Sequence, residues 1–282
     1  MVIKEIKLDF KKQKEINILP IGDIHFNSEM FDEHRFNEWV YVFKHTKNPF
    51  CAIVGDITDE DRPSMRLRRQ EMFYDRIEAY RAEDKQHLDF MDKYVIPKLS
   101  FLNKDNCIGL LDGDHYRLYS NGLTSTQYIC SKLNLTYLRD GQAIVSVKYF
   151  SGHGTKTTPR GSYNIILKHG CGFSRTNGKI LNYLIDFAKQ YANIDCVISG
   201  HRHQCVNGFL ILRKFNPAVL TIRKKEVLIV NTGSFRNSFS YNFTDYAEKK
   251  EYPENNGKQA CINVKFIRHL NENEAKVKCI TF

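Results

Sequence analysis

The sequence predicts an α/β fold in which β-sheets lie between layers of helices, and three observations predict it. Short, nearly continuous apolar segments recur along the chain, and each runs into a glycine. Segments with helical spacing of apolar residues lie between several of them. Potential ligands, aspartate or histidine, stand at or next to the glycines. Apolar strands that alternate with helices are typical of sheets covered on both faces, and ligands of such folds gather at the carboxyl ends of the strands.

The predicted strands are short, apolar and rich in β-branched residues, which is typical of buried strands. With the ligand residues that follow them, they are INILPIGDIH (16–25), FCAIVGD (50–56), NCIGLLDGDH (106–115), YNIILKHG (163–170) and DCVISGHRH (195–203). Two further strands, ACINVKFIRHL (260–270) and AKVKCITF (275–282), are predicted to form a hairpin that closes one sheet. The strand pattern therefore predicts a sheet-forming core along most of the chain.

Helices are predicted over residues 31–45, 123–133 and 178–191. The stretch between Asp56 and Gly113 is far longer than a simple crossover needs. Its second half carries apolar residues at helical spacing (Leu88, Met91, Val95 and Leu99). We therefore expect a single domain over residues 1–282, with a helical insertion at about 60–105 and C-terminal strands at about 259–282.

Composition limits the classes of function. The chain has 282 residues, 42% of them hydrophobic, which is ample for a core, and a net charge of +10, which favours a polyanionic partner only weakly. Its eight cysteines form no CxxC pair, so we expect reduced, buried thiols and a cytoplasmic location. The N-terminal stretch has no apolar core of a signal peptide and no apolar run is long enough for a membrane span, so no membrane partner is expected.

The residues at the strand ends predict a metal site. Each of them has an ordinary explanation when it is taken alone: Asp23 fits a turn, Asp56 a helix cap, and the pair His201 and His203 a polar loop. Together they are hard to explain in that way, because all are metal-ligating types and all follow predicted strands. Metal coordination explains the whole set.

The order of these motifs resembles the calcineurin-like metallophosphoesterase superfamily, whose pattern is DxH, GD, GNH, H and GHxH. Four of the five blocks match, and the third reads GDH because Asp114 replaces the usual asparagine. The resemblance covers residues 16 to about 236, including NTGSF (231–235). It implies a four-layer α-β-β-α sandwich, two metal ions and hydrolysis of phosphate esters.

The resemblance also implies roles for individual residues. One metal ion would be held by Asp23, His25, Asp56 and His203. The second would share Asp56 and take Asp114, His169 and His201. His115 would not be a ligand; its counterpart in the family donates a proton to the leaving oxygen or steadies the developing charge.

The ligand types narrow the choice of metal. Four histidines with three carboxylates are too rich in nitrogen for a typical calcium or magnesium site, and no cysteine belongs to the set. We expect two divalent ions, with manganese favoured and iron or zinc as alternatives.

Asp114 also bears on the substrate. A third carboxylate lowers the positive charge of the loaded site, which weakens attraction for the dianion of a monoester more than for a singly charged diester. We therefore expect a phosphodiesterase that hydrolyses a nucleotide or nucleic-acid phosphodiester by attack of a metal-bridging hydroxide. Two alternatives stay open: a phosphomonoesterase, including a protein phosphatase, and a non-catalytic binding scaffold on the same fold. The oligomeric state is left open.

Five arginines are candidates for binding substrate phosphate. Arg117 and Arg175 follow two of the motifs, and Arg66, Arg68 and Arg69 lie at the start of the predicted insertion. Arginine suits this role because its guanidinium group matches the geometry of phosphate oxygens. The alternative for the insertion is a solvated helix face, because acidic and basic residues are mixed along it.

Overall fold

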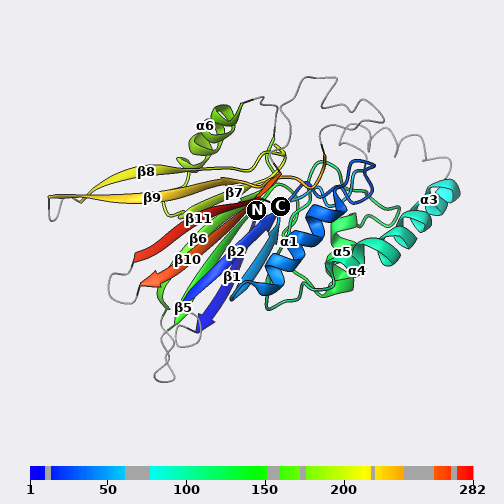
Figure 1. Ribbon diagram of the computed structural model, residues 1–282, viewed down its shortest axis with the longest axis horizontal. Coiled ribbons are helices and arrows are strands. Elements are labelled where there is room, and N and C mark those ends of the chain that lie inside the picture. The colour runs from blue at the N-terminus through cyan, green and yellow to red at the C-terminus, as the bar shows by residue number, and fades with distance from the viewer. Residues whose placement is uncertain are drawn as a thin grey trace.

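Two β-sheets pack face to face, with helices on the outer face of each (Figure 1). This architecture is seen in a computed structural model, which describes residues 1–9, 14–60, 77–150, 159–171, 176–216, 220–237, 257–267 and 272–281. The α/β sandwich predicted from the sequence is therefore confirmed, with both sheets lying between helical layers.

One sheet has five strands in the order β11-β10-β2-β3-β4. Its parallel part consists of β2 (Glu15–Ile21), β3 (Pro49–Ile53) and β4 (Cys107–Leu110). β10 (Lys258–Ile267) and β11 (Glu272–Thr281) form the predicted antiparallel hairpin, and β10 pairs with β2. The C-terminal hairpin thus extends the sheet that begins near the N-terminus.

The other sheet has six strands in the order β1-β5-β6-β7-β9-β8. These strands are β1 (Val2–Asp9), β5 (Gln142–Phe150), β6 (Pro159–Lys168), β7 (Cys196–Ser199), β9 (Thr221–Asn231) and β8 (Val206–Asn216). β6, β7 and β9 run parallel, so their carboxyl ends meet at one edge. The hairpin of β8 and β9 extends beyond its neighbours (Figure 1). β1, β5 and β8 were not predicted from the sequence.

Adjacent residues of the central strands pack into different hydrophobic cores, because successive side chains point to opposite faces of a sheet. Ile18 lies in the apolar cluster between the sheets, and Leu19 lies in the cluster beneath the helices. Ile165 and Ile166 divide in the same way in the six-stranded sheet. Strands that are buried on both faces have continuous apolar sequences, which is why the sequence revealed them.

Helices α1 (Glu33–His45), α5 (Ser125–Leu133) and α6 (Asn177–Ala188) cover the outer faces of the two sheets. α1 packs Phe36, Trp39 and Phe43 onto the five-stranded sheet, and the Asp32 side chain caps it by accepting a hydrogen bond from the N–H of Arg35 at 3.0 Å. α5 lies on the same side. α6 covers the six-stranded sheet.

The predicted insertion contains α3 (Ile77–Phe90), a π-helical turn η1 (Met91–Val95) and α4 (Ile96–Leu99). Met91, Val95 and Leu99 are fully buried and anchor this segment on the five-stranded sheet. Arg66, Arg68, Arg69 and Arg175 lie outside the described residues, so their predicted roles stay predictions. The division into domains also stays a prediction.

Most described thiols are buried, as expected, but Cys171 is exposed. No helix in the described parts of the chain has the combination of length and apolar character that crossing a bilayer would need.

Candidate metal centre

The candidate ligands follow the carboxyl ends of strands from both sheets. Asp23 and His25 follow β2, and Asp56 follows β3, all in the five-stranded sheet. His169 follows β6, and His201 and His203 follow β7, in the six-stranded sheet. The sandwich brings these ends together, so six of the seven predicted ligands form two compact groups of three.

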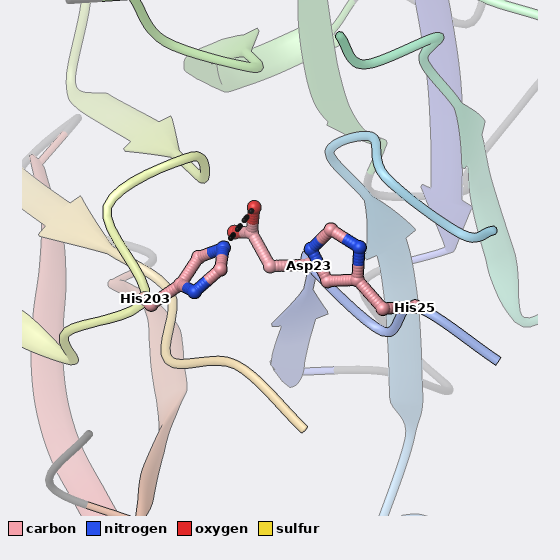
Figure 2. A group of neighbouring side chains, drawn as sticks. All are labelled: Asp23, His25 and His203. Carbon is pink, nitrogen blue, oxygen red and sulfur yellow. Dashed lines mark ion pairs between the residues drawn. The ribbon is translucent and has the colours of Figure 1, made fainter. Parts of the chain in front are cut away.

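The first group consists of Asp23, His25 and His203, whose ligand atoms all lie within 4.8 Å of one another (Figure 2). Asp23 and His25 are almost completely buried. His203 Nε2 lies 3.5 Å from Asp23 Oδ1, and the rings of His25 and His203 are 5.2 Å apart between centroids. Each sheet therefore contributes to this group.

The second group consists of Asp56, His169 and His201. His169 Nε2 lies 3.2 Å from Asp56 Oδ2 and 3.3 Å from His201 Nδ1. The other ring nitrogen of His169, Nδ1, lies 2.8 Å from the carbonyl oxygen of Val54. A carbonyl can only accept, so Nδ1 carries the proton and Nε2 faces the group, which is the arrangement of a typical metal-binding histidine.

The electrostatics of the site favour positive charge. Burial alone lowers the pKa of His169, but the charges of Asp56 and Asp23 outweigh it and raise that pKa to about 10. Burial alone raises the pKa of Asp56, but His169 and the neighbouring histidines lower it well below its usual range. Two ionised carboxylates that are both buried, those of Asp23 and Asp56, attract a cation, whether a proton or a metal ion.

Unpartnered buried atoms show that the donor set fits metal ions. Asp23 Oδ1 and His25 Nε2 are buried, and neither has a hydrogen-bond partner among the described residues. Buried polar atoms are rarely left in this condition unless they serve a ligand. Imidazole nitrogens with carboxylate oxygens suit manganese, iron or zinc.

The backbone at the ligands is strained. Five ligand residues have positive φ angles: Asp23 (51°), His25 (55°), Asp56 (48°), His201 (71°) and His203 (54°). Non-glycine residues rarely adopt this left-handed conformation, and when they do they cluster at functional sites. The fold thus holds these side chains in positions that an unstrained backbone would not give.

Two motif glycines make room for the ligands. A Cβ atom on Gly113 would lie 2.0 Å from Asp56 Oδ1, and a Cβ atom on Gly55 would lie 2.5 Å from His169 Nδ1. Both distances are far below van der Waals contact, and Gly55 also has a φ of +106°. The sequence needs glycine there because another chain segment passes where a side chain would be.

Asp114, the seventh predicted ligand, lies beside the second group. Its Oδ2 is 3.4 Å from His201 Nδ1, and its side chain is 42% exposed. Its role as a ligand stays a prediction.

His115 lies next to the ligands without joining either group. Its backbone N–H donates to Asp56 Oδ1 at 2.8 Å, and its ring centroid is 5.5 Å from that of His25. Its Nδ1 lies 3.0 Å from the carbonyl oxygen of Glu60 and 3.2 Å from Asp59 Oδ1. Because Nδ1 faces two acceptors, Nε2 is the ring nitrogen left for a substrate.

Asp59 is a site residue that the sequence reading missed. Its carboxylate lies 3.4 Å from His25 Nδ1, 3.2 Å from His115 Nδ1 and 3.7 Å from Arg236 Nη1. Burial raises the pKa of Asp59, but its contacts with His25, Arg236 and His115 outweigh burial and hold that pKa well below its usual range. The one available signal was its place in the loop after Asp56.

Arg117 has partners of its own within the chain. Its Nε donates to Asp84 Oδ1 at 3.0 Å, its Nη2 lies 3.5 Å from Glu83 Oε2, and its side chain is only 7% exposed. These contacts favour a structural role, so contact with a substrate phosphate stays a prediction that the geometry does not support.

Comparison with known proteins assigns no family to this chain. No protein-family model matches the sequence, and no curated protein matches it. Among solved structures, the fold is similar to that of a conserved uncharacterized protein from Streptococcus pneumoniae TIGR4, described as a predicted phosphoesterase. The identity is 11%, the TM-score is 0.34, and the match covers 94% of this chain and 99% of that one.

Proposed function

We propose that the protein is a dinuclear metal-dependent phosphoesterase. The observation that carries the proposal is the pair of Asp/His groups, in which ligand atoms from both sheets converge and four of the six side chains are buried. The groups also touch each other, because Asp23 Oδ2 accepts a hydrogen bond from the backbone N–H of His201 at 2.7 Å. Two adjacent divalent ions can stabilise both the attacking and the leaving oxygen in the hydrolysis of a phosphate ester.

The two groups divide the coordination. Asp23, His25 and His203 would hold one ion, and His169, His201 and Asp114 the other, with Asp56 shared. When bound, two such ions lower the pKa of a water molecule and neutralise charge on phosphate oxygens. The chain positions its ligands in advance through left-handed backbone and close glycine contacts, which limits reorganisation during the reaction.

His115 is the proposed proton donor to the leaving oxygen. Asp59 and the carbonyl of Glu60 hold Nδ1, so the ring is oriented and Nε2 is directed away from them. A proton on Nε2 would then face the leaving alkoxide and could be transferred to it.

A diester is the proposed substrate class. Asp114 adds a carboxylate beside His201, which makes the loaded site one charge unit less positive than an asparagine would. A singly charged diester is less dependent on that charge than a dianionic monoester. The net charge of +10 further favours a nucleotide or nucleic acid over a neutral partner.

A substrate panel on metal-quantified protein tests the proposal. We expect hydrolysis of bis(p-nitrophenyl) phosphate with manganese, its loss with a chelator and its return when manganese is added back. Oligonucleotides, cyclic nucleotides and a phosphomonoester complete the panel. A preference for the monoester would favour the phosphomonoesterase alternative, and two bound ions without any hydrolysis would favour the scaffold.

A further inference from the structure

Glu60 contacts both His115, the candidate proton donor, and side chains from other parts of the fold. It directly follows Asp59, and its backbone contacts both the backbone and the ring of His115. The N–H of Glu60 donates to the carbonyl of His115 at 3.2 Å, and the carbonyl of Glu60 accepts from His115 Nδ1 at 3.0 Å. Any movement of Glu60 therefore moves the acceptor that orients the His115 ring.

The Glu60 side chain is held from three directions. Asn27 Nδ2 donates to Oε1 at 2.8 Å, His87 Nε2 lies 2.9 Å from the same oxygen, and Arg117 Nη1 lies 4.0 Å from Oε2. The carboxylate is only 11% exposed. A carboxylate with so little access to water depends on such partners to stay where it is.

His87 belongs to α3 and is itself held in place. Its side chain is 8% exposed, and its Nδ1 lies 2.8 Å from the hydroxyl of Tyr119. Burial and the nearby Glu60 charge raise the pKa of Tyr119, so its hydroxyl keeps its proton and can donate to Nδ1. The other ring nitrogen, Nε2, faces Glu60 Oε1 at 2.9 Å, a close polar contact that is not aligned as a hydrogen bond.

A second set of contacts between α3 and these loops lies one helical turn from His87. Asp84 of α3 accepts from Arg117 Nε at 3.0 Å and from the N–H of Ser120 at 2.7 Å. Asp84 and His87 are three residues apart, so they lie on the same face of the helix. α3 thus contacts the loop after β3, which carries Glu60, and the loop after β4, which carries His115.

We propose that α3 positions His115 through Glu60, with His87 as the positioning residue. This inference rests on the proposed function, because it assigns the inserted helix a role in the same reaction. Without the His87 nitrogen, Glu60 loses a buried partner and shifts toward water, and its carbonyl moves with it. A displacement of about 1 Å at a reacting group costs on the order of 10²-fold in rate.

Variants of His87 separate positioning from packing. His87→Phe keeps a ring and removes both nitrogens, whereas His87→Gln keeps an amide nitrogen near the position of Nε2. We expect His87→Phe to lower kcat by about 10- to 100-fold with KM and metal content unchanged, and His87→Gln to restore most of the rate. Gln86→Ala, on the exposed face of the same helix, is the matched control and should behave as wild type. If His87→Phe does not fold, Tyr119→Phe removes only the hydroxyl that holds His87 and should give a smaller loss of the same kind.

The decisive experiment places His87→Phe in the His115→Ala background. If α3 acts through His115, the double variant is no slower than His115→Ala alone, because there is no acid left to misplace. Losses that multiply would overturn the inference and leave the phosphoesterase assignment intact. Nuclear magnetic resonance of the His115 ring gives a readout that does not need turnover. His87→Phe should shift the His115 ring signals and Gln86→Ala should not, and unshifted signals would overturn the inference even if no substrate were hydrolysed.

Discussion

Asp56 uses both carboxylate oxygens at the site, since Oδ1 accepts from the N–H of His115 and Oδ2 faces His169. Asp56→Asn replaces one oxygen with a donor group and removes the charge that both ions would share. We expect bound metal and activity to fall together while the fold survives, because the apolar cores do not depend on Asp56. Metal analysis with circular dichroism measures both. Asp186→Asn, an exposed change on α6, is the control, and full turnover with two ions retained would contradict the assignment of Asp56.

His115 contacts the candidate ligands without being one, which makes its substitution informative. His115→Ala should keep the metal content near that of wild type and lose roughly 10²- to 10⁴-fold in rate. Substrates with a nitrophenolate leaving group should lose less than those with an alkoxide, because nitrophenolate leaves without a proton. Parallel kcat measurements on the two substrates check this, and equal losses would argue against proton donation.

Asp114→Asn tests the charge argument for a diester. The amide oxygen can still bind a metal ion, while the site gains one unit of positive charge. We expect the ratio of kcat/KM for a monoester to that for a diester to rise. The ratio is measured on metal-quantified wild type and variant, and a constant ratio or a shift toward the diester would remove the charge argument.

The ligand groups could be predicted from the sequence because every ligand follows the end of a buried strand. Asp59 and Glu60 could not. Their roles depend on His115, from the loop after β4, and on His87, from α3, and only the folded chain brings these together. For Arg117, its place after a motif predicts a phosphate contact, which stays a prediction, and the structure pairs it with Glu83 and Asp84 of the insertion.

At the scale of elements, the loops after the strands depend on glycine. Gly113→Ala would place a methyl group 2.0 Å from Asp56 Oδ1, so the carboxylate must move. We expect loss of metal binding with a smaller effect on the melting temperature, since the strained loop lies at the edge of the sheet and outside the cores. Calorimetric metal titration and thermal unfolding measure the two effects.

Gly178→Ala is the matched control for Gly113→Ala. Gly178 lies in the first turn of α6 with nothing within 4 Å of its added methyl. Alanine there should leave metal binding unchanged and stabilise the fold by about 0.4–1 kcal/mol. Equal metal affinity in the two variants would show that the loop tolerates the methyl group.

The predicted strands and the missed ones differ in burial. β3 and β7 are continuous apolar runs covered on both faces, which the sequence shows plainly. β5 alternates buried and half-buried residues along its whole length, and no ligand marks its end. β8 carries exposed Phe209, Ile211 and Phe215, so its pattern does not mark a core strand. Pairing partners that are distant in sequence, such as β1 with β5, also leave no local signal.

At the scale of the whole molecule, each ligand group takes residues from both sheets, so metal binding links the two halves of the sandwich. Manganese at a hundredfold excess over Kd should stabilise the fold by about 2.7 kcal/mol per site, a rise in Tm of roughly 5–10 °C. Thermal unfolding with and without manganese measures this. Asp56→Asn should lose most of the rise, and an equal rise in that variant would place the ions elsewhere.

The charge of the whole chain gives a further prediction for a nucleic-acid substrate. If arginines contact phosphates, the logarithm of the affinity falls with the logarithm of salt concentration, by about 0.7–0.9 for each contact. Replacing Arg66, Arg68 and Arg69 together with alanine should flatten this slope and leave hydrolysis of a small diester unchanged. Binding of a labelled oligonucleotide across a salt series measures the slope. An unchanged slope would favour the solvated helix face.

The order of strands in the five-stranded sheet determines when the site can first exist during synthesis. β2 lies between β3 and β10, so one of its edges has no partner until residues near 260 leave the ribosome. Asp23 is likewise translated long before His203, its companion in the first group. For most of translation, the nascent chain therefore has an incomplete set of candidate ligands. One edge of β2 is also unpaired, and unpaired strand edges are prone to aggregation. Under the proposed function, metal loading would therefore be a late event. A chain that stops before β7 would carry Asp23 and His25 without His201 and His203, which complete the two groups.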